Sequence, residues 1–306
     1  MQTTLCRDKT ILGIGLHSGK PVRMRLRPAP ADSGITFFRV DLPDAIRAVK
    51  VSPESWREAS LCTILENESG ARVSTVEHLL AALHGCGIHN LHIEIDGPEV
   101  PILDGSADPF VRHILNTGLR MLDTPVNVIR VLRTVTVETE AGSAQLQPGP
   151  TLEIDFEIDF SDPAIGHQRK QLRMSNGTFL RELSDCRTFC MRKDVEVMQA
   201  NGLALGGNLD NAVVFHDGTV LSPGGLRRAD EPVRHKMLDV MGDLYVAGLP
   251  LLGRYKGVRA GHALTGRLLQ ALFSDPANYA IMPCHDPVEA ALPGIGITAQ
   301  DLRLSA

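Results

Sequence analysis

The sequence of 306 residues lacks the features that would place it in a membrane or outside the cell. No apolar run approaches the ~20 residues that a membrane-spanning helix requires. The first ten residues, MQTTLCRDKT, contain no basic region followed by an apolar stretch, so we see no secretory signal. We therefore expect a protein of the cytoplasm that does not insert stably into a membrane.

Closely paired cysteines and a strong positive charge are also missing. The six cysteines include no C-x-x-C pair and form no dense framework, which indicates a reducing compartment. Cys186 and Cys190 are four residues apart, but no second pair completes a thiolate zinc site. A net charge of −5 disfavours non-specific binding to nucleic acid, so we expect no nucleic-acid partner.

The chain is long enough for two domains, and its local patterns divide it in two. In PVRMRLRP (21–28), apolar residues alternate with arginines, which is the period-two pattern of a strand with one buried face. TLEIDFEIDF (151–160) alternates in the same way. LDTPVN (122–127) carries turn chemistry and precedes a fresh run of strands. We expect an α+β fold with an N-terminal domain over 1–123 and a C-terminal domain over 124–306.

Short sequence patterns also predict several helices and turns. Ser106 starts a helical pattern that Gly118 ends, and NAVVFHDGTVL predicts a hairpin whose turn includes Asp217 and Gly218. GIGLHSGK (13–20) is not a phosphate-binding P-loop, because its glycine spacing fails and Pro21 stands where a hydroxyl residue is required. We interpret this segment as a hairpin turn. Further helices are predicted near 191–200, 231–247 and 262–273.

The residues that carry chemistry lie on two predicted helices, STVEHLLAALHG and EPVRHKMLDVMGDLY. His235, Asp239 and Asp243 recur every four residues, so they share one helix face and can bind a metal. In the other helix, His78 would add a ligand and Glu77 a carboxylate able to take a proton from water. Two histidines and one aspartate leave a coordination position open, which is typical of catalytic sites.

Each of these residues also has a purely structural interpretation. Ser74 and Glu77 match the S-x-x-E capping box, so Glu77 could only fix a helix start. His78 could be a histidine at the edge of a core, and His235 with Asp239 could be a surface pair. The H-x-x-x-D pattern is permissive, and spacing alone leaves these alternatives open.

Longer strings are more specific. STVEHLLAALHGCGI, PILDGSADPF, CRTFC, EPVRHKMLD and AGHAL, in this order, resemble the zinc-dependent UDP-3-O-acyl-N-acetylglucosamine deacetylases of lipid A biosynthesis. The resemblance runs from GIGLHSGK to about Leu272. It implies two similar α+β domains packed through their helices with the sheets outside, as a β-α-α-β sandwich. The zinc cleft would then lie between the domains.

The resemblance also assigns roles to individual residues. The Zn²⁺ ligands would be His78, His235 and Asp239. The catalytic residues would be Glu77 as general base, His262 as a cationic acid, Asp243 as the partner of His262, and Thr188 as an oxyanion donor. The substrate-binding residues would be Phe189, Lys236 and Arg259.

A few positions differ from the family or stay open. Arg259 replaces a lysine that the family commonly has, which keeps the charge but changes phosphate geometry. Asp162 replaces a histidine in the segment near 151–170 that shapes the acyl-chain passage in the family. Cys62 is either a ligand for excess zinc or a small buried thiol. His17 lines the site in the family.

The implied reaction is hydrolysis of the N-acetyl group of UDP-3-O-acyl-N-acetylglucosamine to give UDP-3-O-acyl-glucosamine and acetate. The substrate would be a UDP-sugar carrying an acyl chain, and we expect a monomer. A metal-stabilised binding protein and an amidohydrolase for a peptide or polyamine are the alternatives. Glu77 and His262 favour catalysis, because a structural site needs neither base nor acid. A basic cluster favours the diphosphate substrate, and it comprises Arg234, Lys236, Arg254, Lys256 and Arg259.

Overall fold

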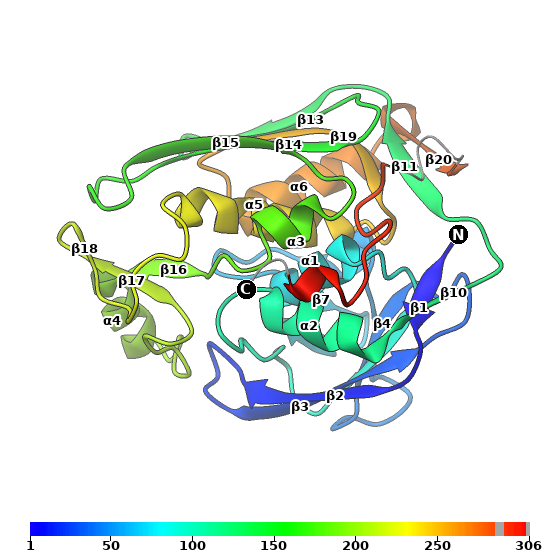
Figure 1. The fold of residues 1–306 in the computed structure, drawn as a ribbon, viewed down its shortest axis with the longest axis horizontal. Helices are drawn as coiled ribbons and strands as arrows, with labels where there is room; N and C mark the ends of the chain where they lie inside the picture. Colours follow the sequence, from blue (N-terminus) through cyan, green and yellow to red (C-terminus); the bar gives the residue numbers. More distant parts are fainter. Residues whose placement is uncertain (285–290, 304–306) are drawn as a thin grey trace.

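The helices form an internal layer between two β-sheets in the computed structural model, which describes residues 1–284 and 291–303 (Figure 1). One sheet is built from the first part of the chain and the other from the second. The α+β fold with outer sheets that we expected is therefore confirmed. None of the helices in the described part of the chain has the length and apolar character needed to span a bilayer.

The N-terminal sheet has the strand order β2-β3-β9-β4-β5. Its strands are β2 (Lys9–Ile14), β3 (Pro21–Pro28), β4 (Ile35–Arg39), β5 (Ala48–Lys50) and β9 (Leu91–Ile95). The alternation predicted for β3 is confirmed, because Val22, Met24 and Leu26 are buried while the arginines between them are exposed. GIGLHSGK connects the antiparallel pair β2 and β3, as the hairpin interpretation required.

The C-terminal sheet has the order β12-β13-β19-β11-β20, and β14 with β15 joins it through β19. Its strands are β11 (Asn127–Val131), β12 (Val135–Glu138), β13 (Ser143–Gln147), β14 (Leu152–Asp159), β15 (His167–Arg173), β19 (Leu251–Val258) and β20 (Tyr279–Pro283). In the described residues, neither large sheet takes a strand from the other side of the 122–126 segment. The exact domain boundary stays a prediction.

Six α-helices in the described residues fill the space between the sheets or extend beyond it. They are α1 (Glu77–Gly85), α2 (Asp108–Thr117), α3 (Thr178–Glu182), α4 (Arg192–Ala200), α5 (Glu231–Tyr245) and α6 (His262–Phe273). Helices α1 and α5 make the most extensive contact between elements. A Cβ atom at Gly242 of α5 would overlap the carbonyl oxygen of Glu77, so only glycine allows this close crossing. The crossing brings the first turn of α1 against the middle of α5.

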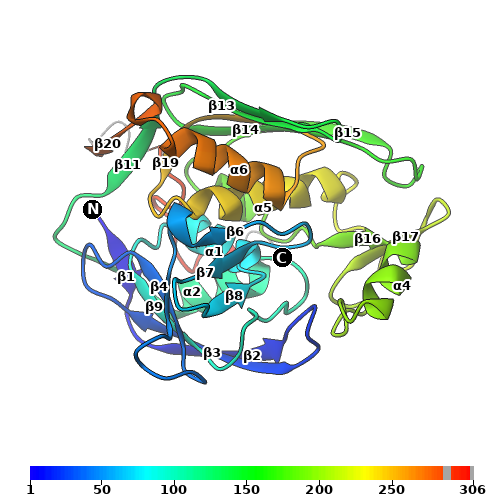
Figure 2. The same ribbon diagram turned by 180° about the vertical axis from the view of Figure 1, so that it is seen from behind.

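Three small sheets complete the part of the fold that the structure describes. They are β1 (Thr3–Leu5) with β10 (Leu119–Met121), β6 (Trp56–Arg57) with β7 (Ile64–Glu66) and β8 (Arg72–Ser74), and β16 (Phe189–Met191) with β17 (Val213–His216) and β18 (Thr219–Val220). Figures 1 and 2 show that β16, β17, β18 and α4 project together from one end of the layers. The predicted hairpin is confirmed: Asp217 and Gly218 both have positive φ, 47° and 78°, as a tight turn between β17 and β18 requires.

Candidate active site

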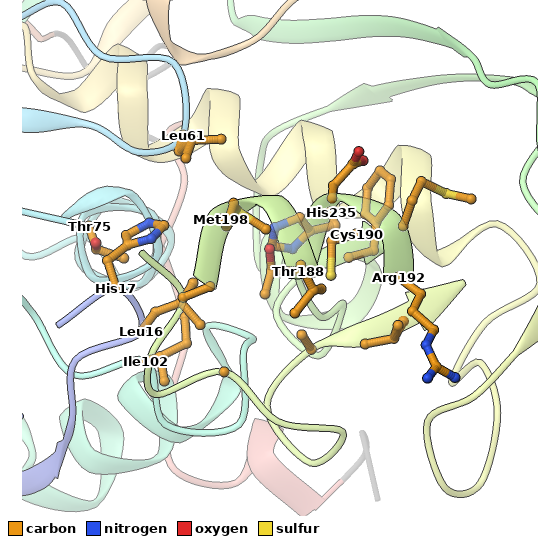
Figure 3. Close-up of a pocket in the computed structure, with 18 of the residues that line it drawn as sticks. Leu16, His17, Leu61, Thr75, Ile102, Thr188, Cys190, Arg192, Met198 and His235 are labelled. Atoms are coloured by element: carbon orange, nitrogen blue, oxygen red, sulfur yellow. The ribbon is translucent and has the colours of Figure 1, made fainter. Parts of the chain in front are cut away.

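A cavity of about 860 Å³ opens between the α1–α5 crossing and the projecting β16–α4 segment. Figure 3 shows part of its lining, with labelled side chains from the β2–β3 turn, β16, α4 and α5. One part of the wall is polar and includes Glu77, His78, His235 and Asp239. The rest is mainly apolar, so the cavity can receive a molecule with both kinds of surface.

The three residues predicted to bind metal come together at the α1–α5 crossing. His78 lies on α1, and His235 and Asp239 lie one turn apart on α5. One ligand atom from each lies within 4.8 Å of the others. The Nε2 atoms of His78 and His235 are 3.6 and 3.3 Å from Oδ1 of Asp239. All three side chains are buried, so the surface-pair interpretation of His235 and Asp239 does not describe this arrangement.

The hydrogen bonds around these atoms fit a divalent metal ion. Nδ1 of His235 lies 3.0 Å from the carbonyl oxygen of Cys186 and donates to it, which leaves Nε2 without a proton. Burial lowers the pKa of His235 to about 3, so the ring is neutral. Oδ2 of Asp239 accepts from Lys236 at 2.5 Å, whereas no donor among the described residues reaches Oδ1. A buried oxygen without a donor, facing two imidazoles, matches a cation site.

Glu77 is held beside this cluster and does not form a capping box. Helix α1 begins at Glu77 itself, no side chain caps it, and the hydroxyl of Ser74 donates to the carbonyl oxygen of Pro98. Oε2 of Glu77 accepts the backbone N–H of Thr63 at 2.9 Å. Burial raises the pKa of this carboxyl group, which strengthens it as a proton acceptor. The capping interpretation is therefore wrong, and the role of Glu77 as a base stays a prediction.

His262 begins α6 and faces the same centre. Its Nδ1 lies 3.0 Å from Oδ2 of Asp243 on α5, and its Nε2 lies 3.9 Å from Oε1 of Glu77. Burial by itself lowers the pKa of His262, but the nearby carboxylates, led by Asp243, outweigh burial and raise it to about 9. The ring is thus protonated at neutral pH, and its Nε2–H points toward the cluster.

The residues expected to contact substrate lie around the polar end, with one exception. Thr188, Phe189 and Lys236 line the cavity. The ring of Phe189 meets the ring of His235 edge to face, with centroids 6.3 Å apart. Arg259 is exposed and is not among the cavity-lining residues. His17 does line the cavity, and neither ring nitrogen has a hydrogen-bond partner in the described part of the chain.

The basic cluster does not form a single patch. Arg234 pairs with Glu182 and Asp230, and Arg254 pairs with Glu153 on the outer sheet. Lys236 is the member that lines the cavity. Neighbouring carboxylates therefore pair with most of the charges of the basic cluster. A diphosphate would meet fewer unpaired cations than the sequence suggests.

The apolar wall of the cavity comes mainly from one segment of the chain. Of the predicted passage near 151–170, only Phe160 lines the cavity. Most apolar lining residues belong to β16, α4 and the loop that follows, and they include Met191, Val197 and Leu209. Asp162 instead accepts hydrogen bonds from the backbone N–H groups at 164 and 218. The passage near 151–170 stays a prediction, and it contributes Phe160 to this cavity.

Several buried residues that support the site were not identified from the sequence. Arg187 and Glu231 form a buried ion pair, with Nε and Oε1 2.9 Å apart, that ties β16 to the start of α5. Glu99 accepts from the backbone N–H groups of His17 and Ser18 and so holds the β2–β3 turn. Arg187 and Glu231 belong to the strings CRTFC and EPVRHKMLD, which offered no clue to their pairing.

Cys62 precedes Thr63 and is buried close to Glu77. Burial, reinforced by the charge of Glu77, raises the pKa of its thiol to about 12. Cys62 is not among the residues that line the cavity. Its capacity to bind excess zinc stays a prediction.

Comparison with known proteins gives a consistent result. The sequence matches the family model described as UDP-3-O-acyl N-acetylglycosamine deacetylase over residues 2–274. The UDP-3-O-acyl-N-acetylglucosamine deacetylase of Haemophilus influenzae (strain 86-028NP) is 44% identical over 287 residues, which cover 93% of this chain and 94% of that protein. Proteins of the same name from Shewanella violacea and Phenylobacterium zucineum are each 45% identical, covering 94% and 92% of this chain and 95% and 96% of those proteins.

Proposed function

The chain belongs to the UDP-3-O-acyl-N-acetylglucosamine deacetylase family, and from that membership we propose that its cavity hydrolyses the N-acetyl group of UDP-3-O-acyl-N-acetylglucosamine. The products are UDP-3-O-acyl-glucosamine and acetate, and the reaction belongs to lipid A biosynthesis. The observation that supports this site most strongly is the meeting of a possible metal-binding triad, a buried carboxylate and a cationic histidine in one cavity.

We assign the metal site to His78, His235 and Asp239, with Zn²⁺ as the ion. Two imidazole nitrogens and one carboxylate oxygen are a common ligand set of catalytic zinc, which retains an open position. A bound divalent ion would polarise the amide carbonyl and lower the pKa of a water molecule.

The protein's own groups would then move the protons. Oε1 of Glu77 takes a proton from the attacking water, while its other oxygen stays bonded to Thr63. Nε2–H of His262 faces the same space and donates its proton to the departing amine nitrogen. The Thr188 hydroxyl donates to the oxyanion, and Asp243 keeps His262 charged and oriented.

Substrate binding would use both parts of the wall. Lys236 and Phe189 contact the sugar nucleotide, and Arg259 reaches its phosphates from outside the cavity. The apolar lining of β16 and α4 receives the acyl chain. We further propose a monomer with domains at 1–123 and 124–306, of which the first supplies Glu77 and His78 and the second supplies the remaining groups.

A direct test measures acetate release from UDP-3-O-acyl-N-acetylglucosamine by the protein as purified, with metal analysis of the same sample. We expect turnover with one metal ion per chain, loss of turnover after chelation, and recovery with Zn²⁺. N-acetylated peptides and polyamines serve as control substrates and should release no acetate. Acetate from these controls but not from the sugar nucleotide would contradict the proposal.

A further inference from the structure

Thr63 makes three polar contacts, and each involves a group of the proposed acid–base machinery. It is the last residue of the loop between β6 and β7 and is buried. Its backbone N–H donates to Oε2 of Glu77 at 2.9 Å, and its hydroxyl donates to Oδ1 of Asp243 at 2.5 Å. The hydroxyl oxygen also lies 3.4 Å from Nδ1 of His262. One residue thus touches the base, the acid and the partner of the acid.

These contacts fix the orientation of two carboxylates. With Oε2 of Glu77 held by Thr63, Oε1 is the oxygen that faces His262. Asp243 accepts from the Thr63 hydroxyl at Oδ1 and from the His262 ring at Oδ2, so both of its oxygens are engaged. Rotation of either carboxylate would break a buried hydrogen bond, which is costly when no water can replace it.

The contacts of Thr63 also join the two halves of the chain. Thr63 and Glu77 belong to the first half of the chain, whereas Asp243 and His262 belong to the second. The hydroxyl bond joins residues 180 positions apart. The separation between the groups that accept and donate the proton therefore depends on this residue.

Two other buried threonines, Thr117 and Thr4, use the hydroxyl differently. Thr117 donates to the carbonyl oxygen of His113 one helical turn earlier, and Thr4 donates to that of Asn90. Those bonds satisfy backbone carbonyl groups, and neither threonine lines the cavity. Thr63 instead bonds to a side chain whose position determines that of His262.

We propose that Thr63 is a positioning residue that holds the Asp243–His262 pair in fixed relation to Glu77. The inference rests on the proposed roles of Glu77 and His262. Thr63 is absent from the cavity lining, so it does not contact substrate. Its loss should therefore affect turnover and leave substrate binding nearly unchanged.

The test compares Thr63→Val, which removes the hydroxyl but keeps the shape, with Thr63→Ser, which keeps the hydroxyl. We expect Thr63→Val to lower kcat by about 10- to 100-fold, the range that misplacement of a reacting group produces, with KM within about twofold. Thr63→Ser should recover most of the lost kcat. Thr117→Val is the matched control, because it also deletes a buried hydroxyl, and its kcat should equal that of the unmodified protein.

A double-mutant cycle shows whether Thr63 acts through Asp243. In an Asp243→Asn background, the effect of Thr63→Val on kcat should shrink toward none, because the pair it positions is already damaged. Should Thr63→Val fail to fold, Thr63→Ala provides the hydroxyl deletion. Metal content should match the unmodified protein throughout.

The inference would be overturned by a Thr63→Val protein with unchanged kcat, or by a Thr63→Ser protein as slow as Thr63→Val. A full Thr63→Val effect in the Asp243→Asn background would also overturn it. If Glu77→Ala and His262→Ala lose activity in the same series, such a result removes only the role of Thr63. If those two variants keep full activity, the proposed function itself fails.

Discussion

Helix α4 and the α1–α5 pair line the same cavity but are packed very differently. Every residue of α1 is buried, as is every residue of α5 except Arg234 and Lys236. No residue of α4 is buried, and Val197 on this helix is 63% exposed although it lines the cavity. The atoms whose separations must be held to a few tenths of an ångström lie on the tightly packed pair. The wall assigned to the acyl chain lies on the loosely packed helix.

This difference has a physical cause. A proton donor and acceptor must keep hydrogen-bond geometry, and close packing restricts side chains to one position. An apolar chain needs only area, which an exposed helix can supply in several conformations. We therefore expect substitutions on α1 and α5 to change chemistry and metal content, and substitutions on α4 to change substrate affinity.

The largest effect should come from His235→Ala on α5. The substitution removes one of three metal ligands in a buried site, so we expect loss of stoichiometric metal and loss of acetate release together. Metal analysis of the purified protein checks the first result, and circular dichroism should show an intact fold because alanine favours helix. Glu196→Ala on α4 is the control and should keep the metal. Full metal content in His235→Ala would contradict the ligand assignment.

The next effect concerns His262 on α6. His262→Ala should lower kcat/KM by about 10²- to 10⁴-fold, the usual contribution of one positioned acid or base. Metal content should be unchanged, because His262 is not one of the three ligands. The measurement is acetate release across the whole pH range. Near-normal kcat/KM at every pH would remove the acid assignment.

Asp243 should determine where the alkaline limb of that pH profile lies. Protonated His262 is the active form, so activity falls as pH rises through its pKa, which is raised to about 9. Asp243 is the largest contribution that raises this pKa, and Asp243→Ala should lower it. The limb should then move to lower pH, with the metal retained. An alkaline limb at the same pH in both proteins would show that another group titrates there.

The smallest effect should come from α4. Val197→Ser replaces two methyl groups by a hydroxyl on the apolar wall, and each buried CH₂ contributes ~0.8 kcal/mol. We expect kcat/KM for the acylated sugar nucleotide to fall several-fold through KM, with no change in thermal stability. For the deacylated sugar nucleotide, kcat/KM should be lower at the start and insensitive to the substitution. Equal losses on the two substrates would argue against the acyl chain lying on α4.

The sequence predicted the parts of the fold that depend on local patterns. The alternation in β3 and the helical period of α6 led to their observed ranges, because neighbouring residues alone create those patterns. The stripe of His235, Asp239 and Asp243 was likewise readable from a period of four. His78 and Glu77 were candidates from their own helical segment, and the longer strings added His262 and joined all three to the residues of α5.

The features that could not be predicted from the sequence depend on contacts between segments that are far apart along the chain. The bond from Thr63 to Asp243 joins two halves of the chain, and nothing near either residue predicts the other. The family resemblance assigned the acyl-chain passage to residues near 151–170, but which segments line the cavity follows only from the fold. The family resemblance and the basic cluster assigned Arg259 to phosphate binding, and its exposed position outside the cavity follows only from the fold.

We propose that Glu77 at the α1–α5 crossing accepts a proton while its neighbours hold the metal. The Glu77→Ala variant tests this division of roles most directly. Metal content and acetate release should be measured on one preparation of this variant and of the unmodified protein. We predict an unchanged metal-to-protein ratio and a loss of turnover, because Glu77 accepts the proton without being a ligand. A Glu77→Ala protein with unchanged kcat would contradict the account, since the cavity would then hydrolyse its substrate without this base.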